Sequence, residues 1–355
     1  MTKKPGRQSQ RSHGQSTRHR GPPPASMLLC GLLLTACAGS IRHPAAHDCP
    51  ASRLLPAMGT HWLFTVDLPC SPGSDPVANF NLVAHEIDRL EHVWSTYRPD
   101  SETSRINQGA GDWQPVTADT AALLTSAMRI HELTGGAFDP TVGPLMHLWR
   151  FTADAAPPPL EDIETARQRV GLDRVRFRSA PQTELLLPAG MRLDFGGIAK
   201  GAAAGQVCAL LARWFDRVAV DAGGDIVVHT APGAEPWNIT LRNPLDRTAP
   251  GTRIILANGA VMTSGTTERF FFHQGRRYHH IIDPRTGWPP PGLLACTVIG
   301  PNAAAADALA TALIVMGPAA GTALIESLPG WSCRMLLEDG SIIRSSGFPQ
   351  EITGD

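Results

Sequence analysis

The chain has 355 residues, 43% of them apolar, and a formal net charge of −1. This composition excludes a disordered chain and supplies enough apolar side chains for a sizeable core in one large domain or two. Six of the 31 Lys and Arg residues lie in the first 36 positions, so the rest of the chain carries 25 of them against 32 Asp and Glu, a balance of about −7. Nucleic-acid binding driven by phosphate contacts is therefore not expected.

The first 36 residues are typical of an export signal. A basic segment without acidic residues precedes the apolar run 27–36, which is far shorter than the roughly 20 residues that span a bilayer. The run ends in Leu34-Thr35-Ala36-Cys37, which resembles the lipobox of bacterial lipoproteins; the alternative is an ordinary signal peptide that contains a cysteine. We expect residues 1–36 to be a signal peptide, 37–53 a tether and 54–350 the folded domain, held at a membrane in the bacterial periplasm by a lipid on Cys37.

Five cysteines follow Cys37, and none of them has the spacing of a zinc site. An oxidising periplasm would allow one disulfide, with Cys49 and Cys70 as candidate partners. Because the count is odd, at least one thiol stays unpaired.

The folded part is predicted to begin with a strand at 58–68, where apolar and polar residues alternate. Apolar residues at three- and four-residue steps predict a helix at 75–94, with Asp75 as its cap and Pro76 in its first turn. A second helix is predicted at 118–133, ending at Gly135-Gly136.

The second half of the chain alternates strands, glycine turns and helices. A turn at 156–162 leads into a helix, and 187–201 predicts a strand and a glycine turn before an Ala-rich helix at 201–214. Strand and turn segments follow in 217–229 and 252–265, then helices at 303–316 and 319–328 and a final hairpin around residues 339–340. No regular βαβ rhythm or repeat is present, so the predicted fold class is α+β.

Asp307 and Thr311 lie four residues apart on a predicted helix. This spacing places a carboxylate and a hydroxyl on one face, and both are hard oxygen ligands suited to Mg²⁺ or Ca²⁺. The alternative is that Asp307 is a charge near a helix N-terminus and Thr311 a core residue bonded to a backbone carbonyl.

Lys200 is the only lysine after Lys4 in a chain that otherwise uses arginine. It follows a Gly-Gly turn at a helix start, where backbone N–H groups favour anions, so the position could require a compact ammonium group. A solvated helix end that retains a lysine by chance is the alternative interpretation.

The segment "RYHHIIDPRTGWP" at 277–289 holds two adjacent histidines, either of which could be a general base with a pKa near neutrality. Neighbours on a strand point to opposite faces, so at most one of His279 and His280 faces a given site. The only two tyrosines, Tyr97 and Tyr278, could stack on a flat ligand or belong to the core.

The commonest nucleotide and hydrolase motifs are missing from the sequence. It contains no GxGxxG, GxxxxGK[ST], GxSxG or HExxH, which removes the usual Rossmann, P-loop, hydrolase and zincin signals.

Eight segments in order resemble the motifs of the ApbE family of FAD:protein FMN transferases: "MGT", "STYRPDSETSRIN", "TGGAFDPTVGPLMHLW", "LDFGGIAKG", "DAGGDI", "TSG", "RYHHIIDPRTGWP" and "ADALATALIVMG". The resemblance covers residues 58–317. It implies a T-fold-like α+β arrangement of mixed helices and antiparallel sheets around a central FAD cleft. It also implies a Mg²⁺-dependent enzyme that transfers FMN from FAD to a threonine or serine hydroxyl of a target protein and releases AMP.

The resemblance also implies residue roles. His280 matches the catalytic histidine, read as the base that takes the proton of the acceptor hydroxyl, and His279 is then a bystander. Asp307 and Thr311 match the metal ligands, joined by a backbone carbonyl at the Gly197 turn. The matching flavin-binding positions are Met58, Tyr97, Ala137, Phe138, Asp139, Asp194, Lys200 and Ile282, and the anionic cofactor would be the partner of the lone lysine.

Two other functions use the same features. A FAD pyrophosphatase would employ the same metal site with water as acceptor and yield FMN and AMP, whereas a lipid-tethered flavin-binding protein would not turn FAD over. A base and two metal ligands argue against pure binding. The family implies acceptors among periplasm-facing subunits of electron-transfer complexes.

Overall fold

The computed structural model describes residues 51–67, 75–152, 154–179, 182–243, 245 and 251–352. The predicted signal peptide, Cys37, the Cys49–Cys70 pair and most of the tether lie outside these residues. The tether was expected to extend to residue 53, but the first strand already begins at Ala51. Among the described cysteines, Cys208, Cys296 and Cys333 are buried free thiols.

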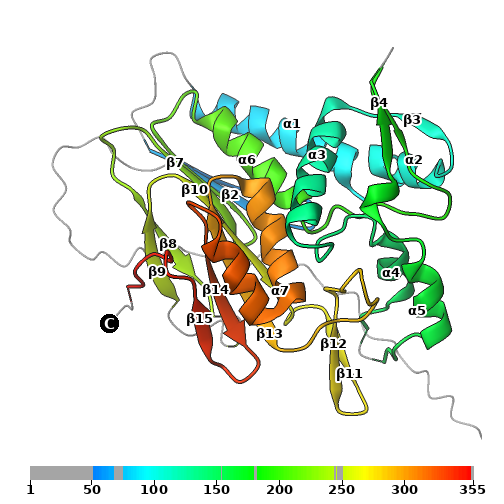
Figure 1. Ribbon diagram of the computed structural model, residues 1–355. Helices are drawn as coiled ribbons and strands as arrows, with labels where there is room; N and C mark the ends of the chain where they lie inside the picture. The colour runs from blue at the N-terminus through cyan, green and yellow to red at the C-terminus, as the bar shows by residue number, and fades with distance from the viewer. Residues whose placement is uncertain are drawn as a thin grey trace, which may run out of the picture. The chain divides into compact units, whose positions relative to one another are not determined.

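An eight-stranded antiparallel sheet forms the centre of the fold (Figure 1). Its strands lie side by side in chain order, so the other elements are insertions between consecutive strands. In this order they are β1 (Ala51–Ala57), β2 (Thr60–Val66), β6 (Arg217–Ala222), β7 (Asp225–Thr230), β10 (Gly259–Gly265), β13 (Leu293–Gly300), β14 (Ser332–Leu337) and β15 (Ile342–Arg344). All eight residues of β13 are buried, as expected for a strand covered on both faces.

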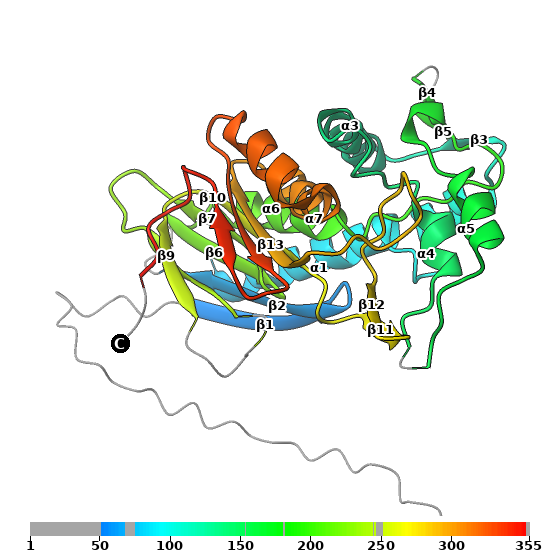
Figure 2. The same ribbon diagram turned by 60° about the horizontal axis from the view of Figure 1, so that its bottom comes forward.

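Three helices cover one face of this sheet (Figure 2): α1 (Pro76–Trp94), α6 (Ala199–Leu211) and α7 (Ala303–Glu326). The predicted pattern of α1 is confirmed, because Asp75 accepts a hydrogen bond from the Val77 N–H and Pro76 occupies the first turn. The strand predicted at 58–68 is also confirmed as β2. Its buried residues Trp62 and Phe64 face the helices, and the Phe64 ring stacks on Phe80 of α1 at 6.2 Å.

Helix α6 is buried between its neighbours, which explains its Ala- and Gly-rich sequence. A Cβ atom at Gly201 would lie 2.4 Å from the carbonyl oxygen of Ala303 and 2.7 Å from the Cβ of Asp307, both on α7. Only glycine permits this approach without displacement of the backbone. The close contact between α6 and α7 therefore requires glycine at position 201.

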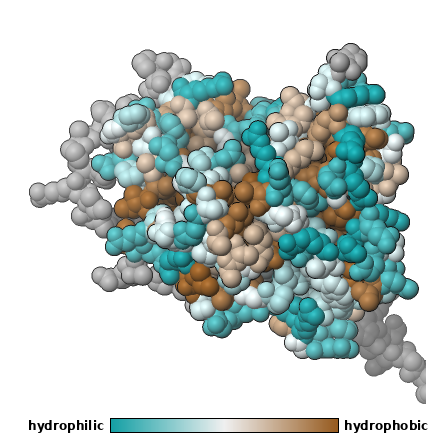
Figure 3. All heavy atoms as spheres, viewed as in Figure 1, coloured by the Kyte–Doolittle hydropathy of each residue, from teal (hydrophilic) through white to brown (hydrophobic). Residues whose placement is uncertain are grey.

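Helix α7 is interrupted where the sequence predicted two separate helices. Gly317 has a φ of 78° and Pro318 follows it, so the helix bends between its two halves. By length and composition α7 could cross a membrane, but it packs against β10 and β13. Apolar side chains gather near the middle of the surface in the view of Figure 3, where α7 lies.

The long insertion between β2 and β6 holds most of the remaining elements. They are α2 (Glu102–Gln108), β3 (Trp113–Pro115), α3 (Ala118–Leu133), α4 (Gly143–Leu148), α5 (Leu160–Arg167), the short helix Leu172–Arg174, β4 (Arg176–Arg178) and β5 (Glu184–Leu186). Strands β3, β5 and β4 form a small sheet of their own. Helix α3 has the bounds predicted from the sequence.

Two hairpins complete the fold. β8 (Trp237–Leu241) pairs with β9 (Thr252–Leu256) and packs on the sheet, whereas β11 (Phe270–His273) pairs with β12 (Arg276–His279). The second hairpin joins α4 and α5 in a separate apolar cluster, in which Tyr278 stacks on Trp149 at 5.8 Å. Tyr278 is thus a core residue, one of the two possibilities left open by the sequence.

One predicted strand is wrong, and one helix is shifted. Residues 187–195 form no strand; Arg192 makes only an isolated bridge to Val142, although Met191, Leu193 and Phe195 are buried in alternation. Alternating burial occurs in any extended segment that lies on a core, with or without ladder partners. The Ala-rich helix begins at Ala199 and ends at Leu211 rather than spanning 201–214.

Candidate active site

A single cleft of about 1380 Å³ contains every site residue that the sequence implied. Pockets for small molecules usually have roughly 300–1,000 Å³, so this one has room for a large ligand. The predicted residues in its lining are Met58, Tyr97, Ala137, Phe138, Asp139, Asp194, Gly197, Lys200, His280, Ile282, Asp307 and Thr311. They come from the β1–β2 turn, the insertion that follows β2, the start of α6, the segment after β12, and α7.

Asp307 lies in the second turn of α7, a helix capped by the Asn302 side chain. The carboxylate is 4% exposed and accepts a hydrogen bond from the backbone N–H of Gly201 at 2.9 Å. Burial raises the pKa of Asp307 to about 6; Lys200 opposes this rise and Asp225 adds to it. A cation beside this carboxylate would stabilise its ionised form.

Thr311 lies one turn further along α7, and its Oγ1 is 2.9 Å from the hydroxyl of Ser264 on β10. A Cβ atom at Gly197 would be 3.0 Å from this Oγ1, so the Gly197 turn lies directly against Thr311. Asp307, Thr311 and the Gly197 backbone therefore offer hard oxygen donors in one part of the cleft. This donor set fits Mg²⁺, which protein sites often hold by one or two carboxylates together with substrate phosphates.

No cluster of three or more His, Cys, Asp or Glu side chains suited to a metal occurs among the described residues.

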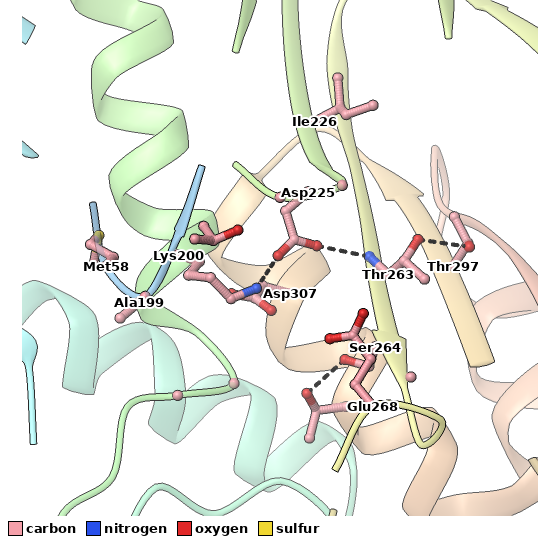
Figure 4. A pocket seen from close by; sticks show the side chains of 18 of the residues that line it. Met58, Ala199, Lys200, Asp225, Ile226, Thr263, Ser264, Glu268, Thr297 and Asp307 are labelled. Carbon is pink, nitrogen blue, oxygen red and sulfur yellow. Dashed lines mark hydrogen bonds and ion pairs between the residues drawn. The ribbon is translucent and has the colours of Figure 1, made fainter. Parts of the chain in front are cut away.

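Lys200 forms an ion pair with Asp225 of β7, and the other oxygen of Asp225 accepts the backbone N–H of Thr263 at 3.0 Å (Figure 4). Burial alone lowers the pKa of the lysine, but Asp225 and Asp307 outweigh it and hold the pKa above its usual value. The lone lysine thus has a protein carboxylate as its partner, whereas the sequence predicted the cofactor in this role. Its solvated-helix-end alternative does not apply.

The two histidines have different surroundings. His279 is the last residue of β12 and is buried; its Nε2 donates to the carbonyl of Pro290 at 2.7 Å, and its Nδ1 accepts from the Ile281 N–H at 3.3 Å. His280 is the first residue after the strand, not within it, and lines the cleft. Its Nδ1 lies 3.3 Å from the carbonyl of Arg269, which can only accept, so Nδ1 carries the proton.

Burial lowers the pKa of each histidine to about 4. Both rings are therefore neutral at pH 7. Both nitrogens of His279 are engaged, but the Nε2 of His280 has no proton and is available as a base.

The side of the cleft formed by the flavin-binding positions that the resemblance implies combines an exposed ring with a strained turn. Tyr97 is 80% exposed, and its hydroxyl lies 3.5 Å from a guanidinium nitrogen of Arg269. Met58 has a φ of 48°, and its backbone N–H donates to Glu91 at 3.2 Å. The buried apolar part of this wall consists of Ala137, Phe138 and Ile282.

The two carboxylates on this side differ in availability. Asp139 accepts hydrogen bonds from the N–H and hydroxyl of Thr141 and from the Leu172 N–H at 2.6–3.0 Å. Its side chain therefore links the protein segments around Thr141 and Leu172. Asp194 accepts one bond, from the Gly196 N–H at 2.8 Å. Burial raises the pKa of Asp194, and neighbouring arginines, Arg269 among them, oppose the rise.

The family model described as "ApbE family" matches residues 58–335 of the chain. The chain belongs to the ApbE family. This confirms the resemblance derived from the motifs, and with it the α+β class.

Relatives and solved structures of the ApbE family match nearly the whole folded part. The FAD:protein FMN transferase of Treponema pallidum is 35% identical over 301 residues, covering 78% of this chain and 83% of that protein. The enzyme of the same name from Escherichia coli strain K12 is 30% identical over 308 residues, covering 82% and 86%. The crystal structure of the ApbE protein of Thermotoga maritima has a TM-score of 0.76 at 33% identity and covers 84% of this chain and 97% of that one. The chain is thus a member of a family of enzymes.

Four residues that line the cleft of this ApbE family member were not predicted from the sequence: Asp225, Ser264, Arg269 and Glu91. Asp225 and Ser264 lie in the motifs "DAGGDI" and "TSG", so the family resemblance marked their segments but did not indicate their contacts. Arg269 and Glu91 had no signal, because they meet Tyr97 and Met58 only through the fold.

Proposed function

We propose that this chain transfers FMN from FAD to a threonine or serine hydroxyl of a target protein, with release of AMP, in a Mg²⁺-dependent reaction. The observation that carries the proposal is that the oxygen donors of α7 and the unprotonated Nε2 of His280 open into the same cleft. The relatives' name, FAD:protein FMN transferase, supports the same reaction.

The base acts on the acceptor. Nε2 of His280 takes the proton from the acceptor hydroxyl while the hydroxyl oxygen attacks the phosphorus of the FMN half of FAD. The bond between this phosphorus and the bridging oxygen breaks, and AMP leaves with the bridging oxygen and its electron pair. The Arg269 carbonyl holds the Nδ1 proton and thereby fixes the reactive tautomer.

The oxygen donors hold the metal. Asp307, Thr311 and the Gly197 carbonyl are the protein groups proposed to bind Mg²⁺, which when bound neutralises charge on the pyrophosphate and on the departing AMP. The Lys200–Asp225 pair lies near Asp307, and the charges of both residues act on the pKa of this carboxyl group.

The remaining residues are proposed to bind the flavin. Tyr97 is exposed enough to stack on the isoalloxazine ring. Ala137, Phe138 and Ile282 would supply apolar contacts, and Met58, Asp194 and Lys200 polar ones. Because both Asp139 oxygens are occupied, Asp139 would contact flavin through its backbone.

A direct test incubates the protein with FAD, Mg²⁺ and a threonine-bearing flavoprotein domain, then follows the acceptor's intact mass and AMP together. A mass gain equal to FMN, accompanied by AMP and lost in His280→Ala, is the expected result. AMP and free FMN without a mass gain would instead identify a FAD pyrophosphatase, and FAD binding without AMP a flavin-binding protein.

We also propose that the chain is exported and attached to a membrane in the periplasm through a lipid on Cys37, where acceptor subunits of electron-transfer complexes would lie within reach. The support is the leader sequence ending in Leu34-Thr35-Ala36-Cys37. Cys37→Ser should release the protein into the soluble periplasmic fraction, and persistent membrane association would refute the anchor.

A further inference from the structure

Arg269 touches both sides of the candidate active site. It lies between β10 and β11, and its backbone carbonyl accepts the His280 N–H at 3.0 Å in addition to the Nδ1 contact. Its guanidinium reaches the Tyr97 hydroxyl across the cleft at 3.5 Å. One residue therefore connects the proposed base with the ring proposed to stack on flavin.

The guanidinium of Arg269 has no carboxylate partner within ion-pair distance among residues 51–352 where the structure describes them, and it is exposed to the cleft. Two other cations of the lining are already paired with carboxylates, and a third, Arg242, lies beyond the end of β8. Lys200 is bound to Asp225, and Arg334 to Glu351. A ligand with negative charge beside His280 would thus find its available positive charge at Arg269.

The charge of Arg269 acts on the groups around it. It contributes to lowering the pKa of His280, and it opposes the rise in the pKa of Asp194. Both effects agree with the position of Arg269, whose backbone carbonyl contacts His280 and which lines the same cleft as Asp194. Arginine is suited to phosphate, because its planar fork can donate two parallel hydrogen bonds.

We infer that Arg269 binds the phosphate group on the flavin half of the substrate and holds it beside His280. The inference rests on the proposed function for the identity of the ligand. The metal ligands then serve the opposite side of the pyrophosphate, and Arg269 donates to phosphoryl oxygens whose charge changes during transfer.

The test measures binding in the full chain without an acceptor, by quenching of flavin fluorescence. Arg269→Gln should weaken FMN and FAD binding at least about tenfold, the loss expected for a hydrogen bond to a charged group, and leave riboflavin binding unchanged. Arg269→Lys should recover part of the affinity. Arg242→Gln, which removes a cleft arginine beyond the end of β8, is the matched control and should change none of the three affinities.

A second measurement does not depend on riboflavin. In the phosphorus NMR spectrum of bound FAD, Arg269→Gln should shift the resonance of the flavin-side phosphorus more than that of the adenosine side. Equal weakening of riboflavin, FMN and FAD would mean that Arg269 acts on the ring through Tyr97 and would overturn the inference, as would unchanged binding and spectra. If either of these overturning results were found and the wild-type chain still transferred FMN, only the phosphate role of Arg269 would fail. If the wild-type chain bound no flavin, the proposed function would fail as well.

Discussion

The carboxylate of Asp307 on α7 accepts the backbone N–H of Gly201 on α6 at 2.9 Å. The hydrogen bond is possible because Gly201 has no side chain at the point where the two helices meet. The position of a proposed metal ligand is thus coupled to the closest helix contact in the core.

We expect Gly201→Ala to destabilise the protein and to impair metal binding together. The added Cβ would lie 2.4 Å from the Ala303 carbonyl oxygen, and overpacking of this kind costs roughly 1–3 kcal/mol. Gly205→Ala on the same helix is the control, because its Cβ would be 3.2 Å from the Ala303 Cβ and helix propensity gains up to about 1 kcal/mol. Chemical denaturation of both variants measures the difference, and equal stabilities would contradict the role assigned to Gly201.

Asp307→Asn should lower Mg²⁺-dependent transfer roughly a hundredfold or more, because a metal ion supplies several kcal/mol of charge stabilisation. EDTA should lower the transfer rate of the wild type to a similar extent. Excess Mg²⁺ should restore the rate of the wild type but not that of the variant. Asp339→Asn, at an exposed turn between β14 and β15, is the matched control. Full wild-type activity in EDTA would remove the metal from the proposal.

His280→Ala should reduce transfer by roughly 10²–10⁴-fold, the range for loss of a general base, while FAD affinity is retained. His279→Gln keeps a group that can donate to the Pro290 carbonyl and should retain most activity per folded molecule. Acceptor mass and FAD titration separate the two effects. Retained transfer in His280→Ala with loss in His279→Gln would reverse the assignment of the base, and an equal loss in both would contradict it.

The stability of the protein should fall on acidification because His279 is buried and neutral. Its pKa is about 4 in the folded protein and 6.5 in an ordinary environment. Between these values the unfolded chain binds a proton that the folded protein excludes, so the free energy of unfolding decreases as pH falls, by ~3 kcal/mol for this residue. Denaturation of His279→Gln at pH 4 to 7 should show a shallower dependence, and parallel curves for variant and wild type would contradict the assignment.

The Lys200–Asp225 pair should respond unequally to loss of either partner. Lys200→Met leaves Asp225, whose side chain is 4% exposed, without its cation, at a cost of roughly 3–5 kcal/mol. Asp225→Asn leaves a lysine that is 33% exposed and can reach water, so the cost should be smaller. A double-mutant cycle measures the coupling from the free energies of unfolding of the three variants. The double variant should lose less stability than the sum of the two single losses, and additive losses would argue against the pair.

Local sequence signals predicted the parts of the fold that have local causes. The cap at Asp75, the bounds of α3, and the interruption at Gly317-Pro318 follow from short-range preferences of individual residues. The segment 187–195 was misinterpreted because its alternation reflects burial on the core and not hydrogen bonding to a neighbouring strand.

The site was predicted as a set of residues, but its internal contacts were not. Asp225 is 25 positions from Lys200 and reaches it only because β7 passes the start of α6. The resemblance singled out His280, but the physical difference is seen only in the structure, where His279 at the end of β12 is buried and His280 lines the cleft. Such relationships depend on strand order, which no spacing in the sequence encodes.

The strands of the central sheet lie side by side in the order of the chain, and the predicted site residues are distributed between Met58 and Thr311 outside these strands. A ribosome therefore adds Tyr97 and Phe138 well before His280, and it adds the proposed metal ligands Asp307 and Thr311 last. A nascent or truncated chain that stops short of Thr311 lacks one of the proposed metal ligands. Chemical competence should arise in a single late event of biosynthesis, so incomplete chains would be unable to consume FAD.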